Sequence, residues 1–263
     1  MGTVTDRHFI EHMTWDEVAR HIESGAAAIL PIGAAAKQHG FHLPLNTDRI
    51  QAEFLASRLA ERIDALIWPT LAYGYYPAFV AYAGSSGLSA ATFEAVVHEI
   101  ATEILKSGCR RLFVLNTGIS TLAPVERALA RLNADMVMHL RIHDGPRYRL
   151  AAEQLAEQSH GSHADELETS LMLALAPHLV DVARAEPSPA LGHEAPGPLT
   201  LSDANSPNYS RSGSYGDPTL ATSAKGEILL AAMLDDLREQ AAAFVAEGAA
   251  VKQRSGAVRS VSR

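Results

Sequence analysis

Short apolar runs alternate along this chain with amphipathic segments of helical length, and this alternation restricts the fold more than any other feature. The sequence predicts strands at 26–33, 65–74, 111–116 and 136–142. It predicts helices at 14–25, 48–63, 89–107, 123–132, 164–175 and 223–246. Strands joined through helices form βαβ units, which run in parallel within one sheet. We therefore expect an α/β fold with three layers, α/β/α, around a mostly parallel sheet.

Length and proline content indicate the domain organisation. A chain of 263 residues suits a single α/β domain, which we place at 1–250. Six prolines fall between 184 and 219 among Ser and Gly residues, so this segment is predicted to be a long loop over the site or against a neighbouring subunit. Residues 251–263 are basic and rich in Ser, and are expected to be a disordered tail.

Composition argues against two classes of partner. The net charge is −8 without a basic patch, which disfavours nucleic acid. No apolar stretch approaches the roughly 20 residues that cross a bilayer, and the N-terminus lacks the apolar run of a signal peptide, so no membrane partner is expected. The single cysteine, Cys109, cannot form an internal disulfide and suits a reducing cytoplasm, where it would be a small buried residue. We expect a cytoplasmic protein.

Ligands of open parallel sheets bind beyond the carboxyl ends of the strands. The segment after the first predicted strand contains several side chains that could bind a metal or take part in catalysis. Lys37, His39, His42 and Asp48 all follow the strand predicted at 26–33. Imidazole and carboxylate groups are ligands that zinc and manganese accept. Helix capping by Asp48 and loop hydrogen bonds from the histidines are the alternative interpretation. A lysine is a poor neighbour for a divalent cation, so the pattern leaves the metal hypothesis open.

A second cluster lies in the sequence HGSHADELETS at 160–170. His163 comes just before a predicted helix whose first turn carries Asp165, Glu166 and Glu168. Carboxylates there complement the positive end of the helix dipole. Alternatively, His163 is a general acid or base whose tautomer is fixed by a nearby carboxylate. Spacing alone does not choose between the two.

Two further segments are candidates for substrate binding. The sequence NTGIST at 116–121 offers backbone N–H groups and hydroxyls, so Asn116 and Ser120 could bind an oxyanion, although the segment could equally be a plain turn. Its glycine pattern is neither a P-loop nor a dinucleotide fingerprint. The loop at 75–87 carries the aromatic residues Tyr75, Tyr76, Phe79 and Tyr82, which would line the pocket or simply pack.

Four segments together resemble the creatininase family, the creatinine amidohydrolases. PIGAAAKQHGFHLPLNTDR at 31–49 is similar to the family pattern P-x-G-S-x-E-Q-H-G-x-H-L-P-x-x-T-D, and HADELETSLML at 163–173 is similar to H-A-G-E-x-E-T-S-x-M-L. YGYYPAFVAYAGSSGLSAATF and SYGDPTLATSAKGE resemble two further motifs, in the family's order. The resemblance implies the creatininase fold, hydrolysis of C–N bonds of small molecules, two divalent metals, and hexamers built from dimers.

The resemblance also implies roles for single residues. Asp48 corresponds to the aspartate that bridges the two metals, and His39 to a metal ligand. His163 and Glu168 correspond to the acid/base histidine and its glutamate. Three ligand positions differ in this chain, because the family's glutamate is Lys37 and its later histidine and acidic ligand are Gly118 and Ser120. A loop histidine of the family falls near Phe79 or Val80 here, so creatinine itself is not the expected substrate.

An ammonium at the metal position makes a binuclear centre unfavourable. Two like charges about 4 Å apart repel by about 4 kcal/mol at an effective dielectric of 20. Lys37 would therefore replace a metal electrostatically, and we expect either no metal or one divalent ion, Zn or Mn, on His39 and Asp48.

Three hypotheses follow for function. In the first, the chain is a hydrolase or lyase acting on a C–N or similar acyl bond, with Lys37, His163 and Glu168 as catalytic residues. A variant of it makes Lys37 a Schiff-base nucleophile, against which its carboxylate neighbour argues. In the second, the chain is a non-catalytic binding or assembly subunit. In the third, it is a mononuclear metal amidohydrolase that recruits ligands such as His42, His160 or His193.

Overall fold

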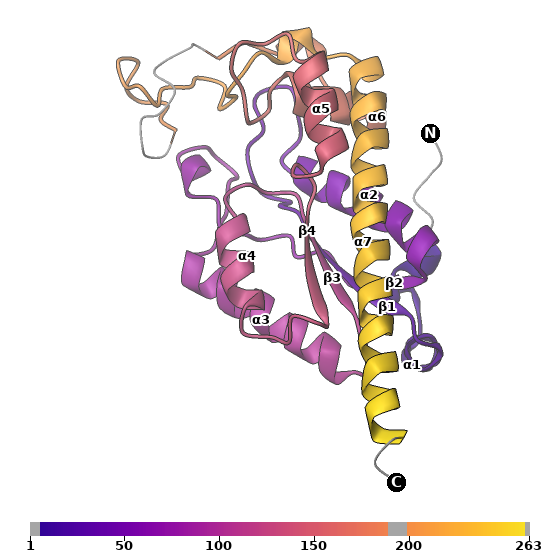
Figure 1. The fold of residues 1–263 in the computed structure, drawn as a ribbon. Coiled ribbons are helices and arrows are strands. Elements are labelled where there is room, and N and C mark those ends of the chain that lie inside the picture. The colour runs from indigo at the N-terminus through magenta and orange to yellow at the C-terminus, as the bar shows by residue number, and fades with distance from the viewer. Residues whose placement is uncertain (1–5, 189–198, 261–263) are drawn as a thin grey trace.

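A four-stranded sheet forms the centre of the molecule (Figure 1). The computed structural model describes residues 6–188 and 199–260. All strand pairs are parallel, in the order β2-β1-β3-β4, and the strands are β1 Ala27–Ile32, β2 Ala65–Ile67, β3 Leu112–Asn116 and β4 Val137–Arg141. The predicted α/β fold with a parallel sheet is therefore confirmed.

Helices cover both faces of this sheet. The seven α-helices of the described residues are α1 Trp15–Ser24, α2 Thr47–Ile63, α3 Ala90–Lys106, α4 Leu122–Leu129, α5 Pro146–Leu155, α6 Glu166–Leu175 and α7 Ser223–Ser260. Short 3-10 turns lie at Asp6–His8, Ile10–His12, Pro77–Phe79, Pro177–Leu179, Val182–Arg184 and Pro218–Leu220. In Figure 1, α3 and α4 lie on one side of the sheet, and α2 and α7 on the other. The three-layer arrangement follows.

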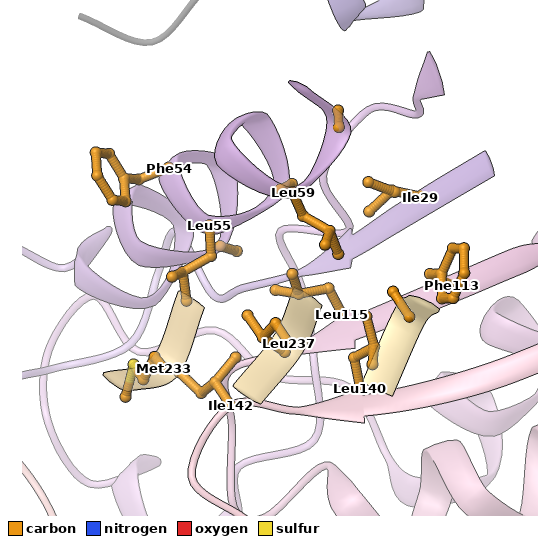
Figure 2. Close-up of a cluster of buried hydrophobic side chains, with 14 of the residues drawn as sticks. Ile29, Phe54, Leu55, Leu59, Phe113, Leu115, Leu140, Ile142, Met233 and Leu237 are labelled. Atoms are coloured by element: carbon orange, nitrogen blue, oxygen red, sulfur yellow. The ribbon is translucent and has the colours of Figure 1, made fainter. Parts of the chain in front are cut away.

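Alternation along each strand divides the core into two clusters. Side chains of a strand point to opposite faces in turn, so Phe113 and Leu115 pack toward α2 and α7, whereas Leu112 and Val114 pack toward α3 and α4. Figure 2 shows the first cluster, in which side chains of α2, α7 and three strands meet. Every residue of β1 is buried, as a strand covered on both faces requires.

Several local signals in the sequence act as predicted. Thr14 and Glu17 form a reciprocal capping box at the start of α1, and Gly25 ends that helix with φ of 99°. Ser89 caps α3 by accepting a hydrogen bond from the Thr92 N–H. Cys109 is buried, and burial raises the pKa of its thiol, as expected for a packing residue.

Several elements differ from the prediction. Helix α5 was not predicted, because Tyr148 is its one buried residue and its apolar periodicity is weak, although Pro146 suits a first helical turn. Strand β2 ends at Ile67 rather than at residue 74, since Pro69 lacks the N–H that a continuing ladder needs. Helix α6 starts at Glu166 rather than Ala164, because Ala164 adopts a positive φ of 47°.

The C-terminal helix is longer than predicted. Helix α7 continues to Ser260, whereas the sequence predicts its end at 246 and a disordered tail from 251. The stretch contains no proline, and its Ala, Arg, Lys and Gln residues favour helix. Residues 261–263 lie outside the described residues, and the assignment of 1–250 as one domain stays a prediction.

The described part of the segment predicted as a long loop contacts the second histidine cluster. Residues 189–198, including His193, lie outside the described part of the chain. Beyond them, Ser210 and Ser214 are buried, and Tyr215 pairs with His163 in an isolated bridge. This loop therefore closes over the second histidine cluster. No helix among the described residues is long and apolar enough to span a membrane.

Helices α6 and α7 cross in direct backbone contact. Gly226 of α7 lies against the carbonyl oxygen of Ser170 in α6, where any Cβ would overlap that oxygen. Lys225, the neighbouring residue, forms an ion pair with Glu166 in the first turn of α6. Glycine at this crossing therefore sets the separation of the two helices.

His139 on β4 provides a test of how burial shapes stability. Neither ring nitrogen has a hydrogen-bond partner among the described residues, and burial lowers the pKa of His139 to about 4. In the unfolded chain His139 is protonated below about pH 6.5, whereas in the folded chain it is protonated only below about pH 4. The free energy of unfolding therefore decreases as the pH falls from 6.5 to 4. We expect His139→Leu to stabilise the protein more at pH 5 than at pH 8 in chemical denaturation; an equal change at both pH values would contradict this.

Candidate active site

Residues that are far apart in sequence meet at the carboxyl edge of the sheet. The loops after β1, β3 and β4 and the first turn of α6 line a cavity of about 490 Å³. Among its lining residues are five of the predicted site residues, Lys37, Asp48, Ser120, His163 and Glu168. This is where the topology of a parallel sheet places a ligand site.

Lys37 and Asp48 form a buried ion pair at one end of the cavity. The Nζ of Lys37 lies 2.7 Å from Oδ2 of Asp48, and the two residues are 7% and 4% exposed. Burial alone would raise the pKa of Asp48, but Lys37 and His39 outweigh it and hold that pKa well below its ordinary value. Asn46, not Asp48, is the N-cap residue of α2. The capping interpretation of Asp48 is therefore wrong, and its carboxylate serves the site.

His39 is completely buried, and its two ring nitrogens face different partners. Nδ1 lies 2.8 Å from the carbonyl oxygen of Lys37, which can only accept, so Nδ1 carries a proton. Nε2 lies 3.0 Å from Oδ1 of Asp48 and 3.8 Å from Oε1 of Glu168. Because ionised carboxylates also accept only, this geometry requires either a second proton on Nε2 or a cation beside it.

His163 is held in one tautomer by the backbone. Its Nε2 donates to the carbonyl oxygen of Gln38 at 2.9 Å, which leaves the lone pair on Nδ1, 3.7 Å from Oε2 of Glu168. Burial, then the charges of Lys37 and His39, hold the pKa of His163 well below its ordinary value. The ring is therefore a neutral base at pH 7, and Phe79 packs on it with ring centroids 4.2 Å apart.

Glu168 reaches both histidines from the first turn of α6. Its Oε2 accepts a hydrogen bond from the Ala164 N–H at 2.7 Å, and its own N–H donates to the N-cap carboxylate of Asp165 at 2.9 Å. The capping interpretation is therefore confirmed for Asp165, and an acid/base role for His163 stays a prediction. Asp165 caps the helix, whereas Glu168 faces the imidazoles.

These residues do not fit two divalent metals. Both oxygens of Asp48 are already in contact, one with the Lys37 ammonium and one with His39. The described residues contain one group that could bind an ion, in which ligand atoms of His39, His163 and Glu168 all lie within 4.8 Å of one another. Each imidazole anchors its far nitrogen on a backbone carbonyl, as metal-binding histidines commonly do. The donor set fits at most one ion.

The residues predicted to bind substrate divide into two groups. Ser120 lines the cavity, and with Tyr75 it also lines a smaller adjoining space that includes Lys37 and Asp48. Asn116 instead builds the turn after β3: its Nδ2 donates to the Gly118 carbonyl, and its Oδ1 accepts from the Thr121 hydroxyl at 2.7 Å. A substrate role for Asn116 stays a prediction without support from these contacts.

The alternative metal ligands do not join the cluster. His42 is bonded through Nε2 to the Thr169 hydroxyl at 2.8 Å, and burial lowers its pKa to about 4. The ring of His160 packs on Tyr215. Neither belongs to the metal-binding group of the described residues, and His193 lies outside those residues.

Two residues of the cavity wall were missed from the sequence. His143, just after β4, and Tyr148, in α5, both line the cavity. The position of His143 beyond a strand end was a usable signal, because segment 143–148 falls at the ligand edge of the sheet. Tyr148 lies in the same segment but gave no further signal of its own, since α5 was not predicted.

Comparison with known proteins agrees with this fold and site. The family model for creatininase, described as creatinine amidohydrolase, matches residues 11–241, and the chain belongs to the creatininase family. The creatinine amidohydrolase of Pseudomonas putida is 30% identical over 242 residues, covering 84% of this chain and 91% of that protein. The mycofactocin precursor peptide peptidase of Mycobacterium tuberculosis is 29% identical over 224 residues, covering 79% and 81%.

Solved structures give the same result. A crystal structure of creatinine amidohydrolase superposes with a TM-score of 0.77 at 26% identity, covering 89% of this chain and 96% of that one. A creatininase solved in a Zn–Zn form gives a TM-score of 0.75 at 27% identity, covering 88% and 96%. The predicted family and fold are therefore confirmed.

Proposed function

We propose that this protein hydrolyses a C–N bond in a cyclic amide, a formamide or a similar acyl compound of low molecular weight. The observation that carries the proposal is the Lys37 ammonium, held 2.7 Å from Asp48 at the cavity, where the family pattern has a glutamate. A creatinine amidohydrolase and a peptide peptidase are among the relatives, and both names denote cleavage of C–N bonds.

Lys37 supplies the electrostatic part of the reaction. Its ammonium faces the cavity and would stabilise the negative charge that develops on a carbonyl oxygen during attack. The carboxylate of Asp48 holds the ammonium in place. A protonated amine is not a nucleophile, so this pairing argues against the Schiff-base variant.

His163 moves the proton. Its Nδ1 lone pair would accept a proton as the oxygen of a water molecule bonds to the carbonyl carbon. The same proton then passes to the leaving nitrogen as the C–N bond breaks, which returns the ring to its neutral form. Glu168, 3.7 Å away, stabilises the imidazolium that exists between these two transfers. Lys37 stays protonated throughout.

Replacing His163 tests this role. We expect His163→Asn to lower kcat by about 10²–10⁴-fold on whichever member of a panel of cyclic amides and formamides the protein hydrolyses, with little change in KM. His42→Asn is the matched control, because His42 is also buried but does not line the cavity. Equal activity of the two variants would contradict the assignment.

A mononuclear metal amidohydrolase is the second candidate function. It is favoured by the convergence of His39, His163 and Glu168 within 4.8 Å. A zinc or manganese ion held there would supply Lewis acidity, and His163 would then be a ligand rather than a base. Metal analysis separates the two candidates. A non-catalytic subunit is less well supported, because such a protein has no need of the His163–Glu168 geometry.

We further propose a cytoplasmic homo-oligomer, a hexamer by family resemblance, that acts on a small molecule without nucleic acid or membrane partners. Size-exclusion chromatography with light scattering tests the assembly. A monomer at micromolar concentration would contradict it.

A further inference from the structure

The cavity extends well beyond the residues assigned to the reaction. Lys37, His163 and Glu168 lie among its lining residues, which also include Ala152 of α5 and Leu167 and Leu171 of α6. Cavities of about 300–1,000 Å³ are typical of small-molecule sites, and this one, at about 490 Å³, is larger than a five-membered cyclic amide needs.

Tyr148 gives this outer part of the cavity a polar group without a partner. The residue is 8% exposed and lines the cavity, and its hydroxyl makes no hydrogen bond to any described residue. The hydroxyl is not among the fully buried polar atoms that lack a partner, so it is accessible from the cavity and can donate to a ligand or to water. Burial also raises the pKa of Tyr148, which keeps the hydroxyl as a donor.

Contacts with α7 hold the backbone of Tyr148 in place. Its backbone N–H donates to Oδ2 of Asp236 in α7 at 2.9 Å, and Arg147 forms an ion pair with the same carboxylate at 3.1 Å. The His143 ring lies beside the Tyr148 ring, with centroids 5.4 Å apart. The first turn of α5 is thus fixed on α7, and the phenol ring is braced by a second side chain of the cavity wall.

The charges around this part of the cavity indicate the kind of group that it accepts. Burial lowers the pKa of His143, so its ring is neutral at pH 7. Among the described residues that line the cavity, Lys37 is the one cationic side chain and is already paired with Asp48, whereas the negative charges of Asp165 and Glu168 act on Tyr148. An anionic group is therefore disfavoured here, and an uncharged acceptor suits the free hydroxyl.

We propose that His143, Tyr148, Ala152 and Leu171 form a specificity subsite for an uncharged apolar arm of the substrate that carries a hydrogen-bond acceptor for the Tyr148 hydroxyl. The substrate class is then a neutral amide with an extended substituent rather than a bare small ring. This inference rests on the proposed function for the position of the scissile bond, but the subsite itself is a matter of binding.

Calorimetric binding to the His163→Asn protein tests the subsite without turnover. The probes are hydantoin, 5-isobutylhydantoin and 5-(4-methoxybenzyl)hydantoin, which add an apolar arm and then an acceptor to one cyclic amide. We expect the dissociation constant to fall at each step of this series. Equal affinities for all three, or no binding by any of them, would overturn the proposal.

Two further substitutions in the same background assign the contacts. Tyr148→Phe should weaken binding of the methoxybenzyl compound about threefold to tenfold, the range of one hydrogen bond, and leave the isobutyl compound unchanged. Ala152→Phe, at a half-buried position, should block both substituted compounds but not hydantoin. Equal losses for all three probes in either variant would contradict the subsite.

Turnover by the natural protein separates this inference from the proposed function. Hydrolysis of small amides without any benefit from the arm would retain the proposed function and refute the subsite. Tighter binding of the arm without hydrolysis of any amide would retain the subsite and refute the proposed function.

Discussion

Lys37→Glu is expected to make the stability of this protein depend on divalent cations far more strongly than that of the unchanged chain. In the natural protein, the ammonium neutralises Asp48 at 2.7 Å in a buried position. The substitution places two carboxylates side by side there, which costs the ion pair, about 3–5 kcal/mol, and adds repulsion. A divalent cation bound between the two carboxylates would neutralise their charge and restore stability. A ligand at 100 times its dissociation constant stabilises the folded state by about 2.7 kcal/mol.

Thermal unfolding in EDTA, MnCl₂ and ZnCl₂ measures this effect. The melting temperature of Lys37→Glu should fall in EDTA and recover with either metal. Lys37→Gln is the matched control, because it removes the ammonium without adding a ligand, so it should lose stability with no recovery. Metal analysis of the natural protein should give well under two equivalents per chain. Two equivalents, or a Lys37→Glu protein indifferent to metal, would refute the replacement of a metal by Lys37.

The second large effect is expected for Lys37→Met, which removes the charge but keeps an unbranched side chain. Asp48 is then buried beside His39 without its ammonium, and breaking a buried pair in this way typically costs about 3–5 kcal/mol. Under the proposed role of Lys37 in polarising the substrate carbonyl, its loss should lower kcat by about 10²–10³-fold. Chemical denaturation and steady-state kinetics give the two quantities on the same samples.

A double variant separates the two losses. Lys37→Met combined with Asp48→Asn should recover most of the stability, since no buried charge is left unpaired, yet remain inactive. Recovery of activity in the double variant would contradict a catalytic role for the ammonium.

The pH dependence of the stability of Lys37→Met provides an independent check on the unpaired charge of Asp48. In the natural protein, the pKa of Asp48 is depressed, so its stabilising contribution is present above the ordinary value of about 3.9 and is lost only as the pH falls through the folded value. Without Lys37, burial raises that pKa instead. The stability deficit of Lys37→Met should therefore shrink between pH 8 and pH 5, because protonation removes the unpaired charge. A deficit that is constant with pH would indicate a packing effect.

Much of this architecture could be predicted because its signals are local. The strand at 111–116 alternates between two buried faces, and the Thr14–Glu17 box and Gly25 mark both ends of α1. The carboxyl-edge rule then places the loop that carries Lys37 at the ligand edge of the sheet, whereas His163, which follows a helix, is outside its reach. Helix α5 escaped prediction because Tyr148 is its single buried residue.

The tautomers of the site could not be predicted, because they depend on tertiary geometry. Which nitrogen of His39 and His163 faces the cavity is set by the carbonyl oxygens of Lys37 and Gln38. The sequence indicates that a carboxylate lies near each ring, but not where a carbonyl group points. The orientation of the Asn116 side-chain amide could not be predicted for the same reason, since it depends on a hydrogen bond from the Thr121 hydroxyl.

The turn after β3 bears on the predicted loss of a histidine ligand at Gly118. A Cβ at Gly118 would lie 2.7 Å from the Thr121 hydroxyl oxygen. That hydroxyl is engaged with Asn116 and the Gly118 carbonyl. Restoring a histidine at this position would therefore disturb the turn as well as add a ligand.

The glycine crossing of α6 and α7 bears on the design of inhibitors. With Gly226 seated on the Ser170 carbonyl, α6 and α7 approach as closely as their backbones allow, so a larger residue at 226 would displace α6, and Glu168 with it. The α6 wall, with Leu167, Glu168 and Leu171, is therefore the surface to which an inhibitor should be fitted.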